Sequence, residues 1–106
     1  MRELIDRARR DESVYAQLLA DDTQLLVYPL AQGALVALGY ERGRAHLVRI
    51  DDMLRRRARQ LSLIGAWLPL MLADGSWYLA RRLDEADGAV ALPGDVELAA
   101  VRAVLQ

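Results

Sequence analysis

The sequence predicts a single α+β domain in which a twisted antiparallel sheet packs against helices. Two apolar stretches, 23–30 and 34–40, are rich in Leu, Val and Tyr and are separated by turn residues, which is typical of neighbouring strands. A later Asp-Gly pair between two apolar runs is typical of a β-hairpin, and helix-compatible segments precede, separate and follow these strands. The expected element order is therefore α-β-β-β-α-β-β-α, in one domain that spans residues 1–106.

The first half of the chain should form one helix and a three-stranded meander. Apolar residues fall near one face of a helix over residues 2–20, although Asp11 and Glu12 interrupt this stripe. The clusters of turn residues that follow divide the next part of the chain into three short apolar segments. Strands are accordingly expected at 23–30, 34–40 and 44–50.

The strand at 34–40 has no polar face. Leu35, Ala37 and Gly39 should point to one side of the sheet, and the residues between them point to the other side: Ala34, Val36, Leu38 and Tyr40. A 106-residue domain cannot easily cover both faces of such a strand with its own elements. We therefore expect another chain to cover part of this surface.

The second half should begin with a helix and a hairpin. Asp51 and Asp52 suit a helix N-terminus, so a helix is expected over 52–64, ended by Gly65. Pro69 lacks an amide donor, so its strand should be an edge strand or locally irregular. A tight turn at Asp74-Gly75 would pair Leu72 with Trp77, Leu70 with Leu79, and Met71 with Tyr78.

The chain should end with a polar loop and a last helix. The loop is expected at 84–88, where acidic residues and glycine gather. Pro93-Gly94-Asp95 then opens a helix. Its inward residues should be Val96, Ala99, Ala100, Ala103 and either Val104 or Leu105.

The composition excludes several classes of protein. Fifteen acidic and 14 basic residues give a net charge of -1, so no overall attraction to nucleic acid or to an anionic membrane is expected. The absence of cysteine excludes a disulfide framework and a thiolate zinc site. The charged N-terminal residues do not resemble a signal peptide, and the longest apolar run, 61–73, is too short and interrupted to span a membrane. A cytoplasmic protein is therefore expected.

The sequence contains no recognisable catalytic or cofactor motif. His46 is the only histidine and has no serine and acid arranged around it, so a structural or surface role is expected. The acidic pairs lie at predicted element ends, where capping and solvation explain them. The glycines form no phosphate-binding loop. We accordingly expect no enzyme activity, no cofactor and no metal.

Two further features have more than one interpretation. The run Arg55-Arg56-Arg57-Ala58-Arg59 could contact phosphates from a helix, but a solvated helix face paired with nearby acids explains it better in a nearly neutral chain. Trp67, Trp77 and Tyr78 could anchor a partner or could belong to an ordinary core. The sequence does not decide between these two roles.

The element order and the stretch 70–83, Leu-Met-Leu-Ala-Asp-Gly-Ser-Trp-Tyr-Leu-Ala-Arg-Arg-Leu, resemble the class I chaperones of bacterial type III secretion. In that family, a pattern of leucine, Asp-Gly, leucine, arginine and leucine often occupies the same place. The resemblance implies a small cytoplasmic homodimer that binds an extended segment of a secreted effector and keeps it competent for export without ATP. Apolar strand surface could take such a segment by side-chain burial or by strand addition at an exposed edge.

The resemblance also implies where partners bind. Dimer contacts would come from the second helix and the strand after it, which correspond to Leu54, Leu61, Ile64, Trp67 and Leu68. Effector contacts would come from the strand faces and the first helix, which correspond to Tyr15, Leu26, Tyr28, Leu35 and Ala37.

The chain departs from that family in being short and nearly neutral. It is therefore also similar to the chaperone-like regulators of the same secretion systems, which bind a transcriptional activator or another regulator and can form heterodimers. The expected interface residues are the same in both cases.

Overall fold

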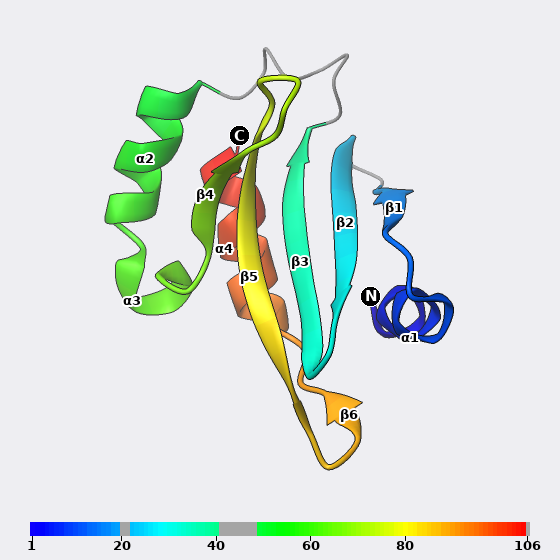
Figure 1. Cartoon of the computed structure of the whole chain (residues 1–106). Helices are drawn as coiled ribbons and strands as arrows, with labels where there is room; N and C mark the ends of the chain where they lie inside the picture. The colour runs from blue at the N-terminus through cyan, green and yellow to red at the C-terminus, as the bar shows by residue number, and fades with distance from the viewer. Residues whose placement is uncertain (20–21, 41–48, 106) are drawn as a thin grey trace.

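The computed structural model describes residues 1–19, 22–40 and 49–105, which form an α+β domain around one curled antiparallel sheet (Figure 1). The strand order is β1-β2-β3-β5-β4, and the short β6 pairs with the far end of β5. In chain order the elements are α1 (Arg2–Asp11), β1 (Tyr15–Leu18), β2 (Thr23–Leu30), β3 (Gly33–Tyr40), α2 (Ile50–Ala58), α3 (Leu61–Ile64), β4 (Leu68–Met71), β5 (Trp77–Ala86), β6 (Ala89–Val90) and α4 (Asp95–Leu105).

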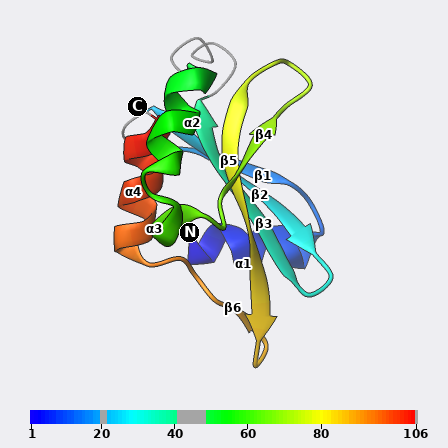
Figure 2. The same ribbon diagram turned by 90° about the vertical axis from the view of Figure 1, so that its left-hand side faces the viewer.

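The helices lie on one side of the sheet. Figure 1 shows α4 behind the strands, and the quarter turn in Figure 2 places α2, α3 and α4 together on one side of them. The buried residues of all four helices join the main core with alternate residues of the central strands. These helix residues are Ile5 and Ala8 of α1, Met53 of α2, Ile64 of α3, and Val101, Val104 and Leu105 of α4.

The two central strands predicted from the sequence are confirmed. β2 begins and ends where expected, and β3 begins one residue earlier, at Gly33. They pair in register from Thr23–Tyr40 to Leu30–Gly33. β3 is apolar on both faces as expected, but this one chain already buries both of them, with only Leu35 half-buried among the eight residues. The expectation that the domain leaves part of this strand for another chain to cover is therefore wrong for all of β3 except Leu35.

The prediction of one helix over residues 2–20 is wrong in its second half. α1 stops at Asp11, and Glu12 caps it in the left-handed conformation with φ of 51°. The chain then forms β1, whose four residues pair with β2 from Tyr15–Val27 to Leu18–Gln24. Pairing with a distant strand thus overrides the local helical preference of this segment.

The middle of the chain differs from the prediction in two ways. Most of the strand expected at 44–50 lies outside the described residues, and its last residue, Ile50, instead begins α2. The helix expected over 52–64 is two helices, because α2 ends at Ala58 and α3 begins at Leu61.

The hairpin at Asp74-Gly75 exists, but its register differs from the prediction by one residue. Met71 pairs with Trp77, and Leu70 with Tyr78. The loop is longer than two residues, because the Leu72 amide donates to the Ser76 carbonyl at 2.9 Å. Only Gly75 has a positive φ, 87°, and the Ser76 amide donates to the Asp74 carboxylate, so a three-residue loop replaces the tight turn.

The polar loop expected at 84–88 is instead a second hairpin. β5 continues to Ala86, which pairs with Ala89 of β6. Asp87 and Gly88 connect them with φ of 53° and 81°, as a two-residue turn of the mirror-image type requires.

The last helix occurs as predicted, but its buried face is only partly as expected. Val104 and Leu105 are buried and Ala100 is half-buried, whereas Val96, Ala99 and Ala103 are exposed. Val101, which was not among the expected inward residues, is fully buried.

We expect Gly39→Ala to lower the free energy of unfolding by about 1–3 kcal/mol, because overpacking a full site forces neighbours to shift. A Cβ at Gly39 would lie 2.6 Å from the Tyr78 ring and 2.7 Å from the Trp77 carbonyl oxygen. Urea denaturation followed by circular dichroism would measure the loss. Gly94→Ala is the control, because a Cβ there meets nothing within 4 Å. Equal stability of both variants with the parent would contradict the prediction.

Candidate functional site

The side of the sheet opposite the helices carries a second apolar cluster, which we call the open face. Every helix residue in a buried cluster belongs to the main core, and the open face consists of strand residues and Leu72. Figure 1 looks onto this side. Its members are Leu26 and Tyr28 of β2, Leu35 and Ala37 of β3, Leu70 of β4, Leu72, and Tyr78 and Ala80 of β5.

Strand register places these side chains next to one another across four strands. Ala37 lies at the centre, paired with Leu26 on β2 and with Ala80 on β5. Tyr28 pairs with Leu35, and Leu70 with Tyr78. Directly paired side chains on one face of a sheet are in contact, so the cluster is continuous from β2 to β4.

The open face has a rigid floor and a more accessible upper layer. Leu26, Ala37, Tyr78 and Ala80 are buried by their neighbours in the sheet. Tyr28, Leu35, Leu70 and Leu72 are only partly buried although they pack on this cluster. A partner on this face would therefore contact mainly these four side chains.

Few polar groups lie on the open face. The Tyr78 hydroxyl donates to Gln24 Oε1 at 2.9 Å. Arg82 and Asp84 form an exposed ion pair at 3.1 Å, opposite Leu35 and Gly33 in the register. The centre of the face carries no charged residue, which suits contact with apolar side chains.

The structure brings together four of the five residues predicted to bind a partner. Leu26, Tyr28, Leu35 and Ala37 all lie on the open face, where they form two cross-strand pairs. Tyr15 does not join them, because it packs against the main core on the other side of the sheet.

Tyr15 is held near the end of α1 by polar contacts. Its hydroxyl donates a hydrogen bond to the Asp11 carboxylate, and this bond raises the pKa of Tyr15 above its ordinary value. The Arg7 guanidinium lies 5.9 Å from the centre of its ring. Tyr15 thus fixes β1 against α1, a position that the predicted helix did not allow.

Sequence reasoning missed half of the open face. Leu70, Leu72, Tyr78 and Ala80 belong to it, but the expected hairpin register placed Tyr78 on the opposite side from Leu70. The signal that could have corrected this is Ser76 after Asp74-Gly75, since aspartate often binds the amide two residues later in a wider loop.

The residues predicted at a dimer interface divide into two groups. Leu54, Leu61 and Leu68 have exposed fractions of 42%, 50% and 60%. Ile64 and Trp67 are instead fully buried in the main core of their own chain, so they do not form a surface. Their inclusion in the predicted interface is corrected accordingly.

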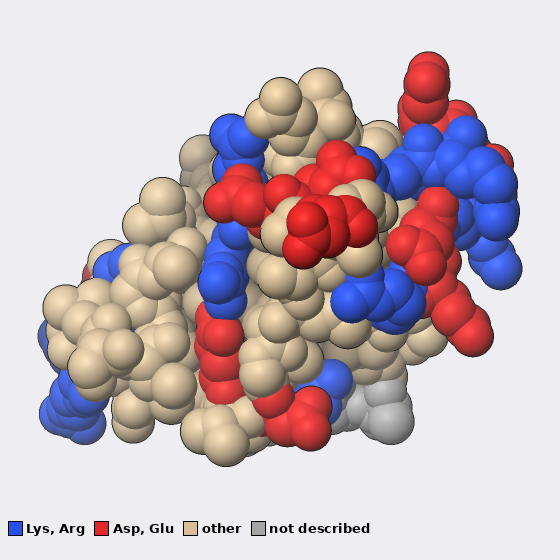
Figure 3. Space-filling model, turned by 90° about the horizontal axis from the view of Figure 1, so that it is seen from below, with Lys and Arg blue, Asp and Glu red and all other residues tan. Residues whose placement is uncertain are grey.

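The exposed apolar residues of β4 lie on both sides of the sheet. Leu68 pairs with Ala80 and so lies on the open-face side, whereas Met71 pairs with Trp77 and lies on the other side. Leu63 of α3 and Met71 of β4 are also exposed, at 40% and 58%. Figure 3, seen from below, shows charged side chains gathered over α1 and the β5–β6 hairpin, whereas the side formed by α3 is mostly uncharged. We call the exposed leucines of α2 and α3 the lateral patch: Leu54, Leu61 and Leu63.

Trp67, Trp77 and Tyr78, which the sequence left open as partner anchors or core residues, lie in three different environments. Trp67 is core: its Nε1 donates to Glu97 Oε1 at 2.7 Å, and Arg81 binds the same carboxylate. Trp77 is half-buried against the main core. Tyr78 belongs to the open face, where its ring lies against Gly39.

Two of the four arginines in the run at 55–59 make internal contacts. Arg56 Nε donates to the Val104 carbonyl at 2.9 Å, near the C-terminus of α4. Arg57 donates to the carbonyls of Trp67 and Gly65, at 2.8 and 3.1 Å. Exposed Arg55 lies 3.5 Å from Asp52. Two of the four guanidinium groups therefore bind main-chain carbonyls of the same chain.

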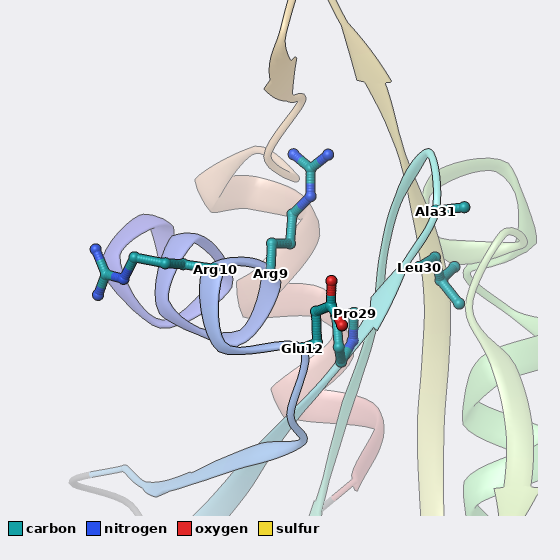
Figure 4. Close-up of a pocket in the computed structure, with 6 residues that line it drawn as sticks. All are labelled: Arg9, Arg10, Glu12, Pro29, Leu30 and Ala31. Atoms are coloured by element: carbon teal, nitrogen blue, oxygen red, sulfur yellow. The ribbon is translucent and has the colours of Figure 1, made fainter.

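A shallow hollow of about 540 Å³ lies between the end of α1 and the β2–β3 turn (Figure 4). Arg9, Arg10 and Glu12 line one side, and Pro29, Leu30 and Ala31 the other. Figure 4 shows that the guanidinium groups do not converge: Arg10 points away from the strands, and Arg9 points toward the β5–β6 hairpin, where it binds Glu85 at 2.9 Å. This geometry does not concentrate positive charge in the hollow.

His46 lies outside the described residues, and its predicted structural role stays a prediction. Within residues 1–19, 22–40 and 49–105, no three His, Asp or Glu side chains gather as they would around a metal ion. In the same ranges, no helix has the length and apolar character that crossing a membrane would require. The open face and the lateral patch are thus the features to which a function can be tied.

Comparison with known proteins found no match for this chain. No family model, no curated protein and no solved structure matches the chain.

Proposed function

We propose that this protein is a non-catalytic binding protein that holds an extended segment of a second protein against its open face. In this proposal it acts in the cytoplasm, as the class I chaperones of type III secretion do, and keeps a secreted effector competent for export. The chemistry needed is burial of apolar side chains, with no bond made or broken. The observation that carries the proposal is the continuous apolar cluster on the side of the sheet away from the helices.

Energetics support a bound partner on this face. Each Å² of apolar surface removed from water contributes about 25 cal/mol, so covering the four accessible side chains would favour association. The buried floor beneath them is fixed by cross-strand pairs and by the Tyr78–Gln24 hydrogen bond. A preformed floor lowers the entropic cost of binding, because little of the chain must become ordered.

The lateral patch supports the second half of the proposal, which is a homodimer. Leu54 of α2 and Leu61 and Leu63 of α3 expose apolar surface on two consecutive helices. Interface cores are depleted of charged residues, and the side formed by α3 is mostly uncharged in the view from below (Figure 3), whereas Arg55 and Arg59 are exposed at α2. Two binding functions would then use two different surfaces: the open face for the segment and the lateral patch for the second copy.

A chaperone-like regulator is the second candidate function. The net charge of -1 favours it, because the class I chaperones that the sequence resembles are distinctly acidic. Such a regulator would bind a folded regulatory protein or a transcriptional activator in place of an unfolded effector segment. Whether the bound partner is folded or unfolded therefore distinguishes the two functions.

We expect Leu35→Asp to abolish binding of an extended partner segment, because it replaces one of the four accessible apolar side chains of the open face with a charge. The new carboxylate would lie opposite Arg82 in the register, which limits the cost to folding. The measurement is size exclusion with light scattering, after co-expression with the product of the neighbouring gene. Val96→Asp, an equally drastic change at an exposed position of α4, is the matched control and should retain the partner.

Two outcomes would oppose the proposal. A Leu35→Asp variant that retains the partner would show that the open face does not bind it. A parent protein that binds only a folded partner, and not its isolated N-terminal segment, would favour the regulator.

A further inference from the structure

A further hollow, of about 330 Å³, opens into the helix side of the sheet, and we call it the core hollow. Its floor consists of Leu25 of β2 and Leu38 of β3, which pair with each other and are buried members of the main core. One wall is formed by Leu98 and Arg102 of α4, which lie one turn apart on the same face of that helix. The core hollow therefore reaches the main core where α4 leaves β2 incompletely covered.

The accessible walls of the core hollow are aliphatic. Met1, Leu19 and Leu98 pack against the main core but are only partly buried, and all three line the hollow. Leu92, just before α4, also lines it and is 40% exposed, with Pro93 beside it. A ligand that covers these side chains gains about 25 cal/mol for each Å² of apolar surface removed from water. This lining suits a hydrocarbon chain.

Arg102 gives the core hollow a positive end. Its Nε atom is buried, so the guanidinium acts in surroundings of low dielectric constant, where hydrogen bonds to a charged group are stronger. Asp95, in the first turn of α4, lines the hollow at the other end, and its exposed carboxylate repels a second anion there. An anionic group is therefore favoured beside Arg102 and disfavoured beside Asp95.

The dimensions of the core hollow limit the ligand to one short chain. Arg102 and Asp95 are about 10.5 Å apart along α4, at 1.5 Å per residue, and Leu98 lies between them. A volume of about 330 Å³ is near the lower end of the range for small-molecule sites, about 300–1,000 Å³. The paired long chains of a membrane lipid would not fit such a site.

We infer that the core hollow binds a free, single-chain aliphatic carboxylate of medium length. Its head group accepts hydrogen bonds from the Arg102 guanidinium, and its chain runs along Leu98 toward Leu92. The site lies on the helix side of the sheet and uses no residue of the open face, so it goes beyond the proposed function and does not depend on it.

The first test is calorimetric titration of the full chain with a series of acids from butanoate to octanoate, below the concentrations at which they form micelles. Octanoate should bind most tightly, and each methylene removed should weaken binding about fourfold. Octanol, which has the same chain without the charge, should bind at least about tenfold more weakly than octanoate. A series that gains nothing beyond butanoate would contradict an elongated apolar site.

Two pairs of variants assign the head group and the chain. Arg102→Met keeps an apolar stem and should remove the preference for octanoate over octanol, whereas Arg59→Met, at an exposed position after α2, should keep it. Leu92→Ala should weaken octanoate at least about fourfold. Val96→Ala, which is 72% exposed on α4 and does not line the hollow, is its matched control and should bind normally.

Methyl NMR of the unaltered chain gives a readout that does not depend on the folding of any variant. Octanoate should shift the methyl signals of Leu25, Leu38 and Leu98 and leave those of Leu35 and Leu70 on the open face unchanged. Parent-like octanoate affinity in a folded Arg102→Met variant would overturn the inference. Shifts confined to the open face, or the absence of any binding to the unaltered chain, would also overturn it.

Discussion

Trp67→Ala should lower the free energy of unfolding by about 3–5 kcal/mol, the range for removing a large aromatic side chain from a core. Trp67 is fully buried, and its loss would leave a cavity where α3, α4 and the sheet meet. Its Nε1 also donates to Glu97, whose carboxylate would keep only Arg81. A domain stabilised by about 5–15 kcal/mol would lose a large share of its stability. Urea denaturation followed by circular dichroism measures the effect.

Trp67→Phe separates packing from hydrogen bonding at the same position. It keeps most of the apolar contact and removes only the indole N–H, so the expected loss is about 1–3 kcal/mol, the contribution of a hydrogen bond to a charged group. Glu97 Oε1 still accepts from Arg81. Glu97→Gln is the matched variant, since its amide oxygen can still accept from Trp67. If Trp67→Ala and Trp67→Phe both unfold at the same urea concentration as the parent, Trp67 does not stabilise the core.

Ile64→Asp should prevent folding, whereas Leu61→Asp, three residues earlier on the same short helix, should not. Ile64 is fully buried, and an unpaired carboxylate there costs several kcal/mol. Leu61 is 50% exposed, so a carboxylate at that position stays in contact with water. Circular dichroism should show a disordered Ile64→Asp chain and a Leu61→Asp chain with the spectrum of the parent.

Leu61→Asp also tests the proposed homodimer. A charge in the middle of the lateral patch should convert a dimer into a folded monomer, which light scattering coupled to size exclusion would detect. Val96→Asp, which places the same charge on an exposed part of α4, should leave the mass unchanged. A Leu61→Asp variant that stays dimeric would show that the lateral patch is not the interface.

The strands that could be predicted from the sequence are those with strong local signals. β2 and β3 combine apolar composition with a short polar turn, and this pattern alone located both to within one residue. The two apolar faces of β3 also led correctly to a sheet with a second apolar side, on which Leu35 and Ala37 lie. These features depend on neighbours a few residues away in the chain.

β1 could not be predicted in this way because its conformation depends on a distant partner. The stretch 15–18 fits a helix as well as a strand, and pairing with β2 decides between them. One local signal does mark the end of the helix. The charged pair Asp11-Glu12 interrupts the apolar stripe, and in the structure Glu12 caps the helix in the left-handed backbone conformation. The sequence therefore predicts Tyr15 on a helix among the partner-binding residues, whereas the structure places it on β1 against the main core.

The two Asp-Gly pairs show how one sequence signal can indicate different turns. Asp87 and Gly88 have the two positive φ angles of a two-residue mirror-image turn, although the acidic residues around them predict a polar loop. Asp74-Gly75 lies between apolar runs, yet its aspartate binds the Ser76 amide and opens the loop by one residue. That single residue moves Tyr78 to the other side of the sheet and changes half of the candidate site.

The proline in the edge strand β4 has a consequence for self-assembly. If both edges could form ladders, β1 of one molecule could pair with β4 of the next, and this head-to-tail contact would repeat without closing and produce a filament. The Leu72 amide donates to the Ser76 carbonyl, so the even-numbered residues of β4 face β5 and Pro69, which has no N–H, faces outward. Pairing of β1 with β4 into an open-ended fibre is therefore disfavoured.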